Sequence, residues 1–241
     1  MRMSASIELT PRLEQVAEYI PAGESVIDIG TDHAYLPLSV ILSGKCPSAI
    51  AADVRPGPLE AARKHIQECQ AEERVTVRLS NGLDAFLPEE LECVVMAGMG
   101  GRLIAELITR AGNQGRLTCC HTLVLQPQSE PDRVRRALHE TGWQIQKEAM
   151  IEDRGKFYVV MQALPGQECY SEEEYEYGRR LFELRDPVFY RVLTEHTEKE
   201  RKIIAALQER NDASETVRRR LKELEDMICR EERMLRAWDA Q

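Results

Sequence analysis

The chain has 241 residues, a formal net charge of −9 and a pI near 5.3, with 43% hydrophobic and 30% charged residues. This length accommodates one globular domain of ordinary size and a smaller appendage. The acidic balance argues against nucleic-acid binding over the whole surface, and the lack of any run of about twenty apolar residues argues against a membrane span.

Short apolar runs alternate with helical patterns as far as about residue 165. In chain order, the patterns predict helix 11–20, strand 25–29, helix 34–44, strand 49–53, helix 58–71, strand 75–79, strand 93–97, helix 102–111, strand 122–126, helix 130–141 and strands 143–151 and 156–163. The last two strands are joined by a turn-like segment at 152–156. Apolar strands alternating with helices imply an α/β fold with a mostly parallel sheet covered on both faces.

Residues 166–241 are highly charged and have a helical pattern with almost no strand signal. Apolar residues recur at heptad-like spacing in two stretches, with Glu231 at a skipped position of the second: Phe189, Leu193, His196, Ile203 and Leu207, then Val217, Leu221, Leu224, Ile228, Leu235 and Trp238. Residues 211–214 read as a turn, with Ser214 capping the next helix. A coiled-coil hairpin within one chain is favoured by this short connection; a single seam that dimerises with another chain is the alternative.

Seven cysteines are scattered along the chain, and none forms a CxxC pair. An odd, scattered set argues against a disulfide framework or a zinc site, so no metal is expected. The N-terminus lacks the apolar core of a signal peptide. We therefore expect a cytoplasmic protein whose thiols stay reduced.

The loop after the first predicted strand gives the strongest local signal. Asp28 and Gly30 lie where the strand turns into a helix, and ligands bind at this edge of parallel sheets. The dinucleotide pattern GxGxxG is absent, because the loop has a single glycine. NAD is therefore disfavoured. S-adenosylmethionine, which has an ammonium group and no pyrophosphate, suits a carboxylate at Asp28.

Two further strands end in residues that suit a nucleoside. Asp53 ends the second strand, where it could accept hydrogen bonds from a ribose diol in either cofactor. Asn81 and Gly82 follow the third strand, where an amide oxygen could meet an adenine amino group. Asn-Gly is also an ordinary turn pair, so both interpretations stay open.

The fourth and fifth strands end at the same predicted edge. Three glycines at 98–101 let backbone approach a flat ligand, although a helix-packing turn is the alternative. The fifth strand ends in Gln126, Pro127 and Gln128, which border the same crevice.

Asp32 and His33 are the candidates for chemistry, because both are polar and lie in the loop expected to face a transferred methyl group. A simpler interpretation makes either residue a cap of the helix predicted at 34–44.

Five motifs, together with the leading helix at 13–21 and the C-terminal extension, resemble one family over nearly the whole chain. They are DIGTDHAYLP at 28–37, AADVRPGPL at 51–59, SNGLD at 80–84, VVMAGMGG at 94–101 and LVLQPQ at 123–128. Their order and spacing are similar to those of the bacterial tRNA (adenine(22)-N1)-methyltransferases, which modify the D-arm.

The resemblance implies a Rossmann-type methyltransferase domain at 1–165, with a seven-stranded sheet, and a helical coiled-coil extension at 166–241. S-adenosyl-L-methionine would be the donor, and N1 of adenine 22 in tRNA the acceptor. Asp32 and His33 would be catalytic. Donor contacts would come from Asp28, Gly30, Asp53, Val54, Asn81, Gly82, Ala97, Gly98, Met99 and Gly100, and substrate contacts from Tyr35, Arg102, Gln126, Pro127 and Gln128. Asn81 and Asp53 depart from the commoner Asp and Glu of the family, but both keep hydrogen-bond acceptors.

The acidic pI conflicts with a tRNA substrate unless basic residues gather locally. Candidates are Arg102 and Arg110, then Arg133, Arg135 and Arg136, and a basic run at 218–222 in the extension. Alternation with Glu in the extension also fits a solvated, salt-bridged face. We expect a monomer or weak dimer. The alternatives are a methyltransferase acting on another acceptor, and a non-catalytic cofactor-binding module that recruits a partner through its coiled coil.

Overall fold

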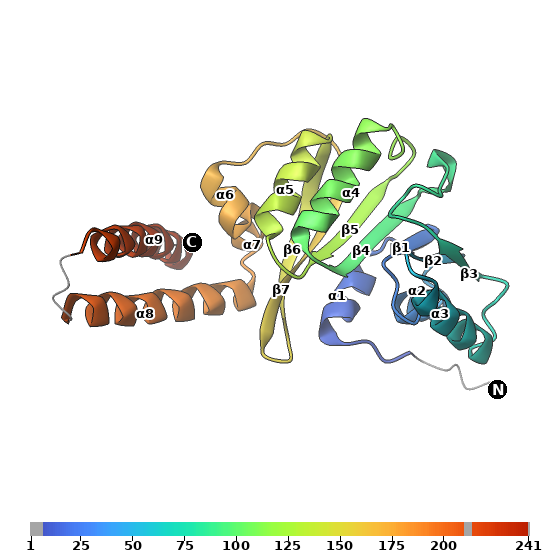
Figure 1. The fold of residues 1–241 in the computed structure, drawn as a ribbon, viewed down its shortest axis with the longest axis horizontal. Helices are drawn as coiled ribbons and strands as arrows, with labels where there is room; N and C mark the ends of the chain where they lie inside the picture. Colours follow the sequence, from blue (N-terminus) through green and yellow to red (C-terminus); the bar gives the residue numbers. More distant parts are fainter. Residues whose placement is uncertain (1–6, 210–213, 241) are drawn as a thin grey trace. The chain divides into compact units, whose positions relative to one another are not determined.

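The computed structural model describes residues 7–209 and 214–240. The chain divides into two compact units, with the boundary between Arg180 and Leu181 (Figure 1). The first unit contains a single sheet and the helices that cover it. The second contains the long C-terminal helices.

The sheet of the first unit has seven strands in the order β3-β2-β1-β4-β5-β7-β6. Its strands are β1 (Val26–Ile29), β2 (Ala49–Asp53), β3 (Val75–Leu79), β4 (Cys93–Met99), β5 (Thr122–Pro127), β6 (Trp143–Asp153) and β7 (Lys156–Pro165). The first five run parallel, and β7 lies antiparallel between β5 and β6. The predicted Rossmann-type sheet and its closing antiparallel strand pair are confirmed.

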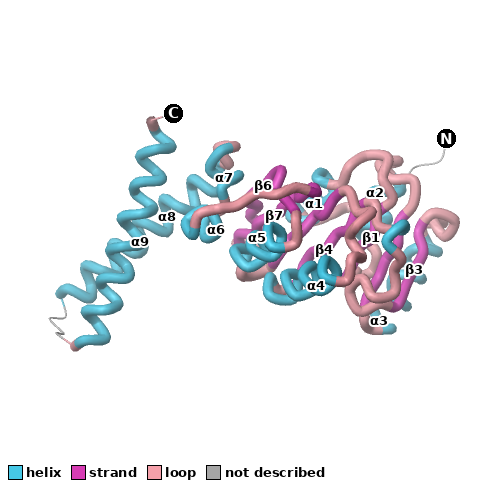
Figure 2. The backbone as a smooth tube through the Cα atoms, turned by 90° about the horizontal axis from the view of Figure 1, so that it is seen from above, coloured by secondary structure: helices cyan, strands magenta, loops and turns pink. Residues whose placement is uncertain are grey.

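Helices cover both faces of this sheet. They are α1 (Pro11–Tyr19), α2 (Tyr35–Leu42), α3 (Pro56–Glu68), α4 (Gly101–Asn113) and α5 (Pro131–Glu140). The short helices α6 (Glu172–Tyr177) and α7 (Arg179–Glu183) follow β7, and a 3₁₀ turn η1 (Pro88–Glu90) lies between β3 and β4. Figure 2 shows α1 on one side of β4 and β7, and α4 with α5 on the other. Helix α3 begins two residues before the predicted start, because proline is well tolerated in a first helical turn.

The central strands are buried along their whole length. Every residue of β1 and β5 is buried, as are the first four residues of β4. This burial explains why these strands read as continuous apolar runs rather than alternating ones. Asp28 is the one charged residue in β1, and it is 6% exposed. A buried carboxylate in an apolar strand indicates a specific role.

Helix α4 begins close against the loop that follows β5. A Cβ atom at Gly101 would overlap the carbonyl oxygens of Ser129 and Glu130, so only glycine fits. The Gly101 N–H donates to Ser129 O at 3.0 Å. The last glycine of the 98–101 run therefore serves helix packing, which was the alternative interpretation of this segment.

A buried ion pair lies under helix α5. Arg135 Nε donates to Glu148 Oε1 of β6 at 2.7 Å, and Arg135 Nη1 donates to Tyr175 O at 2.7 Å. The two side chains are 1% and 0% exposed. The sequence interpretation of Arg135 as a candidate basic surface residue is therefore wrong, because its charge is enclosed between α5, β6 and α6.

The second unit contains α8 (Pro187–Glu209) and α9 (Glu215–Asp239), which contact each other. Of the predicted seam, Phe189 and Leu193 of α8 are buried, together with three residues of α9: Leu224, Ile228 and Trp238. Ser214 caps α9, as predicted, by accepting a hydrogen bond from the Val217 N–H. The rest of the predicted turn, 211–213, lies outside the described residues.

Polar groups also meet in this interface. His196 Nδ1 lies 2.8 Å from Glu231 Oε1, and Thr197 Oγ1 donates to Glu231 Oε2 at 2.9 Å. Glu231 is 1% exposed. Glu231, at the skipped position of the predicted seam, is thus a buried carboxylate. Burying a carboxylate without partners would be costly, and here two polar side chains of α8 bond to it.

No helix within 7–209 or 214–240 is long and apolar enough to cross a bilayer. The same residues hold no cluster of three His, Cys, Asp or Glu side chains that could bind a metal ion.

Candidate active site

A pocket of about 230 Å³ opens at the carboxyl ends of β1 and β4. These strands are neighbours whose connections leave in opposite directions along the sheet, which is where ligands bind in open α/β folds. The lining residues are Arg12, Leu13, Asp28, Gly30, Asp32, Tyr35, Leu36, Ala97, Gly98 and Gln128. Seven of them are residues predicted from the sequence; the other three are Arg12, Leu13 and Leu36.

Asp28 is a buried carboxyl of this pocket. Burial, with a smaller contribution from the nearby carboxylate of Asp53, raises its pKa from 3.8 to about 6, although a hydrogen bond with Thr31 opposes the shift. A carboxyl in this state gains from a cationic group placed beside it, because that group would restore the favourable interactions lost with water. Asp28 is therefore suited to hold an ammonium group.

The glycine loop after β4 is held by the side chain of Gln126. Gly98 has a φ of +75°, a conformation that favours glycine, and its N–H donates to Gln126 Oε1 at 3.0 Å. The same oxygen accepts a hydrogen bond from Arg12 of α1. Gln126 and Pro127 are buried, whereas Gln128 lines the pocket. Of these three predicted substrate contacts, only Gln128 lines the pocket.

Asp32 lines the pocket, and His33 lies beside it without lining the pocket. His33 Nε2 lies 3.3 Å from Asp32 Oδ1, and the side chains are 49% and 82% exposed. The cap of α2 is Ala34, and no side chain bonds to this helix end, so neither residue acts as the cap that the simpler interpretation required.

The backbone at this point is strained. His33 and Ala34 both have φ of +57°, a left-handed conformation that costs free energy in residues other than glycine. Such strain is concentrated at functional sites, where surrounding structure holds it in place.

Aromatic rings surround the strained turn. The Tyr35 ring lies 4.9 Å from the His65 ring of α3, nearly edge to face, and 5.6 Å from that of His33. His65 Nδ1 lies 2.9 Å from the carbonyl oxygen of His33. Sequence reasoning missed His65, because its helical pattern carries no sign that α3 approaches this turn.

The residues predicted to contact the nucleoside lie at the ends of β2 and β3, outside the lining of this pocket. Asp53 is buried, and its Oδ1 accepts a hydrogen bond from the Arg55 N–H at 2.7 Å. Val54 is 59% exposed beside it. Gly82 has a φ of +60°, and Asn81 O accepts from Arg110 at 2.8 Å. The Asn-Gly pair therefore forms a turn at the edge of the sheet. Its contact with the adenine of the donor stays a prediction.

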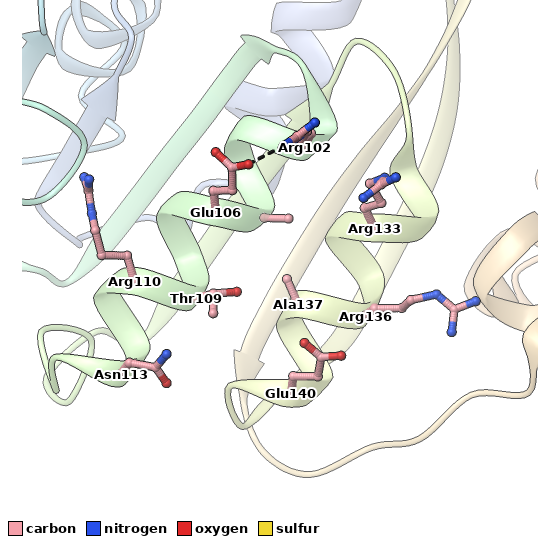
Figure 3. Close-up of a pocket in the computed structure, with 10 residues that line it drawn as sticks. Arg102, Glu106, Thr109, Arg110, Asn113, Arg133, Arg136, Ala137 and Glu140 are labelled. Carbon is pink, nitrogen blue, oxygen red and sulfur yellow. Dashed lines mark hydrogen bonds and ion pairs between the residues drawn. The ribbon is translucent and has the colours of Figure 1, made fainter.

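Arg102 lies on a groove of about 660 Å³ between α4 and α5 rather than in the pocket (Figure 3). Its Nε donates to Glu106 at 3.0 Å. The other arginines of the groove also pair with carboxylates: Arg110 with Asp84, Arg133 with Glu130 and Arg136 with Glu172. These pairs balance the local charge, so the groove by itself gives no net basic surface.

Comparison with known proteins identifies the family. A family model described as a methyltransferase domain matches residues 9–161. The solved structure of a putative tRNA (m1A22) methyltransferase from Streptococcus pneumoniae is 33% identical, with a TM-score of 0.85, and the match covers 95% of this chain and 100% of that one. This chain belongs to the tRNA (adenine(22)-N1)-methyltransferase family.

A further relative of this methyltransferase and a second structure of the Streptococcus pneumoniae protein agree. The tRNA (adenine(22)-N(1))-methyltransferase of Bacillus subtilis is 36% identical over 160 residues, which is 66% of each chain, just under two thirds of that curated relative. The Streptococcus pneumoniae protein solved in complex with S-adenosyl-L-methionine is 34% identical, with a TM-score of 0.81 over 95% of this chain and 100% of that one.

Proposed function

We propose that this protein transfers a methyl group from S-adenosyl-L-methionine to N1 of adenine 22 in the D-arm of tRNA. The observation that carries the proposal is a single pocket lined by the buried carboxylate of Asp28 and the exposed carboxylate of Asp32, which lies 3.3 Å from His33 Nε2. Donor-binding and acceptor-facing groups thus share one cavity. Its position at the β1–β4 junction agrees with the family to which the chain belongs.

The pocket residues fit the donor. The carboxyl of Asp28 suits the methionyl ammonium, and Gly98 exposes backbone where a side chain would fill the space beside Arg12 and Gln128. Asp53 at the end of β2 is placed to accept hydrogen bonds from the ribose, with Val54 and the 81–82 turn near the adenine. We assign the remaining donor contacts to Gly30, Ala97, Met99 and Gly100.

The bound donor supplies an electrophilic methyl group on a sulfonium. The residues of this chain orient the acceptor, and positioning supplies most of the rate. Tyr35 and Gln128 hold the extruded adenine, because chemistry on a base requires its removal from the stack. Methylation at N1 leaves a positive charge on the ring. The Asp32 carboxylate stabilises this charge or accepts a proton from the exocyclic amine, and His33 orients the base.

The helical extension belongs to the same proposal. We propose that residues 1–165 form the methyltransferase domain and that the helical extension at 166–241, whose α8 and α9 form a coiled-coil hairpin, helps to grip tRNA. The protein would act in the cytoplasm as a monomer or weak dimer. Contacts between α8 and α9 within one chain support the hairpin over a seam reserved for another chain.

Donor binding is expected to depend on pH through Asp28. Its pKa is about 6 without ligand, and the ammonium group prefers the ionised carboxylate. Below about pH 6 binding must therefore displace a proton, so the association constant falls by up to about tenfold per pH unit as pH decreases, and it levels off above this value. Calorimetric titrations on both sides of about pH 6 measure this change in the association constant with pH. In Asp28→Asn the pH dependence of donor binding should disappear, and the affinity should be low at every pH. An unchanged pH dependence in this variant would assign the titration to another group.

The activity itself is tested with purified protein, methyl-labelled S-adenosylmethionine and unmodified tRNA transcripts. We expect N1-methyladenosine in nucleoside mass spectra, and none when the D-arm adenine is replaced. A donor that binds without labelling tRNA would favour another acceptor. Absence of transfer to any RNA or protein acceptor, with donor binding intact, would favour a cofactor-binding module.

A further inference from the structure

The hairpin of β6 and β7 extends beyond the edge of the sheet at which the pocket opens. Strand β7 pairs with β5 no further than Met161, whereas it stays paired with β6 out to Lys156. Continuing the β5–β7 register places Val159 opposite Pro127, where β5 ends. Residues 152–158 therefore project past the sheet. They do so at its carboxyl edge, because β6 runs parallel to β5, and Figure 1 shows the hairpin reaching beyond α5.

Contacts with Arg12 hold this hairpin beside the pocket. Arg12 lines the pocket, and its Nε lies 3.8 Å from Asp153 Oδ2, while its guanidinium lies 5.5 Å from the centre of the Tyr158 ring. Lys156 is paired with Asp153 and lies two residues before Tyr158, so the three side chains share one face of the hairpin. Lys156 therefore lies on the face that contacts the pocket wall.

The turn at the tip of the hairpin holds an arginine in an unfavourable conformation. Asp153 pairs with Lys156, so Arg154 and Gly155 form the turn between them, and their φ angles are +53° and +72°. Turns of this kind favour Asn, Asp or Gly, because a left-handed conformation costs free energy in other residues. An arginine at such a position indicates a use for its side chain other than forming the turn.

Arg154 and Lys156 keep their charges available, unlike the arginines of the groove between α4 and α5. Among the described residues of the first unit, the Lys and Arg side chains that make no hydrogen bond, ion pair or ring contact are Arg63, Arg154 and Lys156. Two of these three lie exposed at the tip, with Glu152 as the exposed carboxylate near them. Phe157, the next residue, is 37% exposed. Two cations beside an exposed aromatic ring fit a nucleic acid, which offers phosphates and the faces of bases.

We propose that Arg154 and Lys156 bind the phosphates of tRNA on either side of the extruded adenine. This inference rests on tRNA being the acceptor in the proposed function. Turning a base out of its stack requires that the neighbouring backbone be held, and phosphate contacts fix position without reading sequence. The tip suits this task because it stands beside the pocket on two paired strands. Phe157 offers a face on which a neighbouring base stacks.

The first test measures the dissociation constant of an unmodified tRNA transcript over a range of salt concentrations by fluorescence anisotropy. Arg154→Asn with Lys156→Gln should raise this constant roughly tenfold near physiological salt. The slope of log Kd against log salt concentration should fall by about 1.4 to 1.8, as for two lost phosphate contacts. Phe157→Leu should raise the constant about fivefold or more.

A matched control removes the same charge from another exposed surface. Arg63→Gln with Lys64→Gln takes two positive charges from α3 and should leave the affinity for tRNA within about twofold of wild type. Lys156→Arg keeps the charge at the tip and should bind tRNA as the wild type does.

Arg154→Asn alone separates recognition from folding. Asparagine tolerates the left-handed conformation of the turn, so this variant should unfold at the same or a higher temperature than the wild type. It should nevertheless bind tRNA less tightly. A change that preserves the fold and weakens RNA binding assigns the arginine to the RNA.

A second test locates the contact on the tRNA. Neutral methylphosphonate linkages on both sides of adenine 22 remove the charges that the tip binds. They should weaken binding by the wild type about tenfold and binding by the double variant of Arg154 and Lys156 by less than about threefold, because that variant has no contact left to lose.

Three results would overturn the proposal. They are a double tip variant with the affinity and salt slope of the wild type, an equal loss of affinity in the α3 control, and an equal effect of the neutral linkages on both proteins. In each case, methylation of adenine 22 by the wild type would leave the proposed function intact. A wild-type protein that neither binds nor methylates tRNA would reject the proposed function as well.

Discussion

Replacing Asp32 with Asn is expected to lower kcat by about a hundredfold or more, with donor affinity and thermal stability unchanged. The Asp32 side chain is 82% exposed, and its recorded contact is His33 Nε2 at 3.3 Å. The substitution keeps size and polarity but removes the negative charge that would face the methylated ring. Because a side chain this exposed contributes little to folding, a loss of activity would report on chemistry.

The measurement is single-turnover methylation of tRNA at saturating donor, together with donor binding and thermal unfolding. Glu60→Gln provides a matched control, because it removes one negative charge from an exposed position on α3. The control should retain wild-type rates. A correctly folded Asp32→Asn enzyme with normal kcat would exclude a catalytic role for this carboxylate and leave positioning to Tyr35 and Gln128.

Breaking the buried ion pair should have the largest effect on stability. Glu148→Gln removes the partner of Arg135 and leaves an enclosed guanidinium without compensating charge. The same carboxylate also accepts the Arg180 N–H at 3.2 Å. Loss of one partner of a buried pair costs about 3–5 kcal/mol of unfolding free energy. Urea unfolding followed by circular dichroism measures this cost from the transition midpoint and slope.

The double variant Arg135→Met with Glu148→Leu separates the pair from its surroundings. Apolar residues of similar volume often replace a buried pair without net loss, so we expect this variant to be more stable than Glu148→Gln alone. Arg135 also donates to Tyr175 O, and the double variant leaves this carbonyl without that donor. The double variant should therefore stay less stable than the wild type by the cost of the unpaired carbonyl. A Glu148→Gln protein within about 1 kcal/mol of wild type would show that water reaches the pair.

The sequence predicted the sheet well, because its strands carry their own signal. Strands β1, β4 and β5 are buried on both faces, so they appear as short apolar runs that only a parallel sheet explains. The chemistry-bearing loops follow these strands directly. Once the strands were placed, the meeting of Asp28, Asp32 and Gly98 at one edge followed from the fold.

The rest of the site depends on contacts between segments far apart in the chain. Arg12 reaches Gln126, and His65 reaches the backbone of His33, although nothing in their own helices marks either contact. Arg135 gave the wrong prediction for the same reason. Its helix looks amphipathic and basic, and only the packing of β6 and α6 against it shows that the charge is enclosed.

The first helix of the chain is fixed by the last strands of the sheet. Gln162 Nε2 of β7 donates to Tyr19 O at 2.6 Å, and Asp153 of β6 lies beside Arg12. During synthesis, every motif loop through Gln128 is therefore made before the partners of α1 on β6 and β7 exist, although Lys45 and Gln126, which also bond to α1, are made earlier. A nascent chain of that length has the sequence of a donor site but not its closed wall. We therefore expect affinity for the donor to become complete only when β7 has been added, which would couple cofactor capture to the end of domain folding.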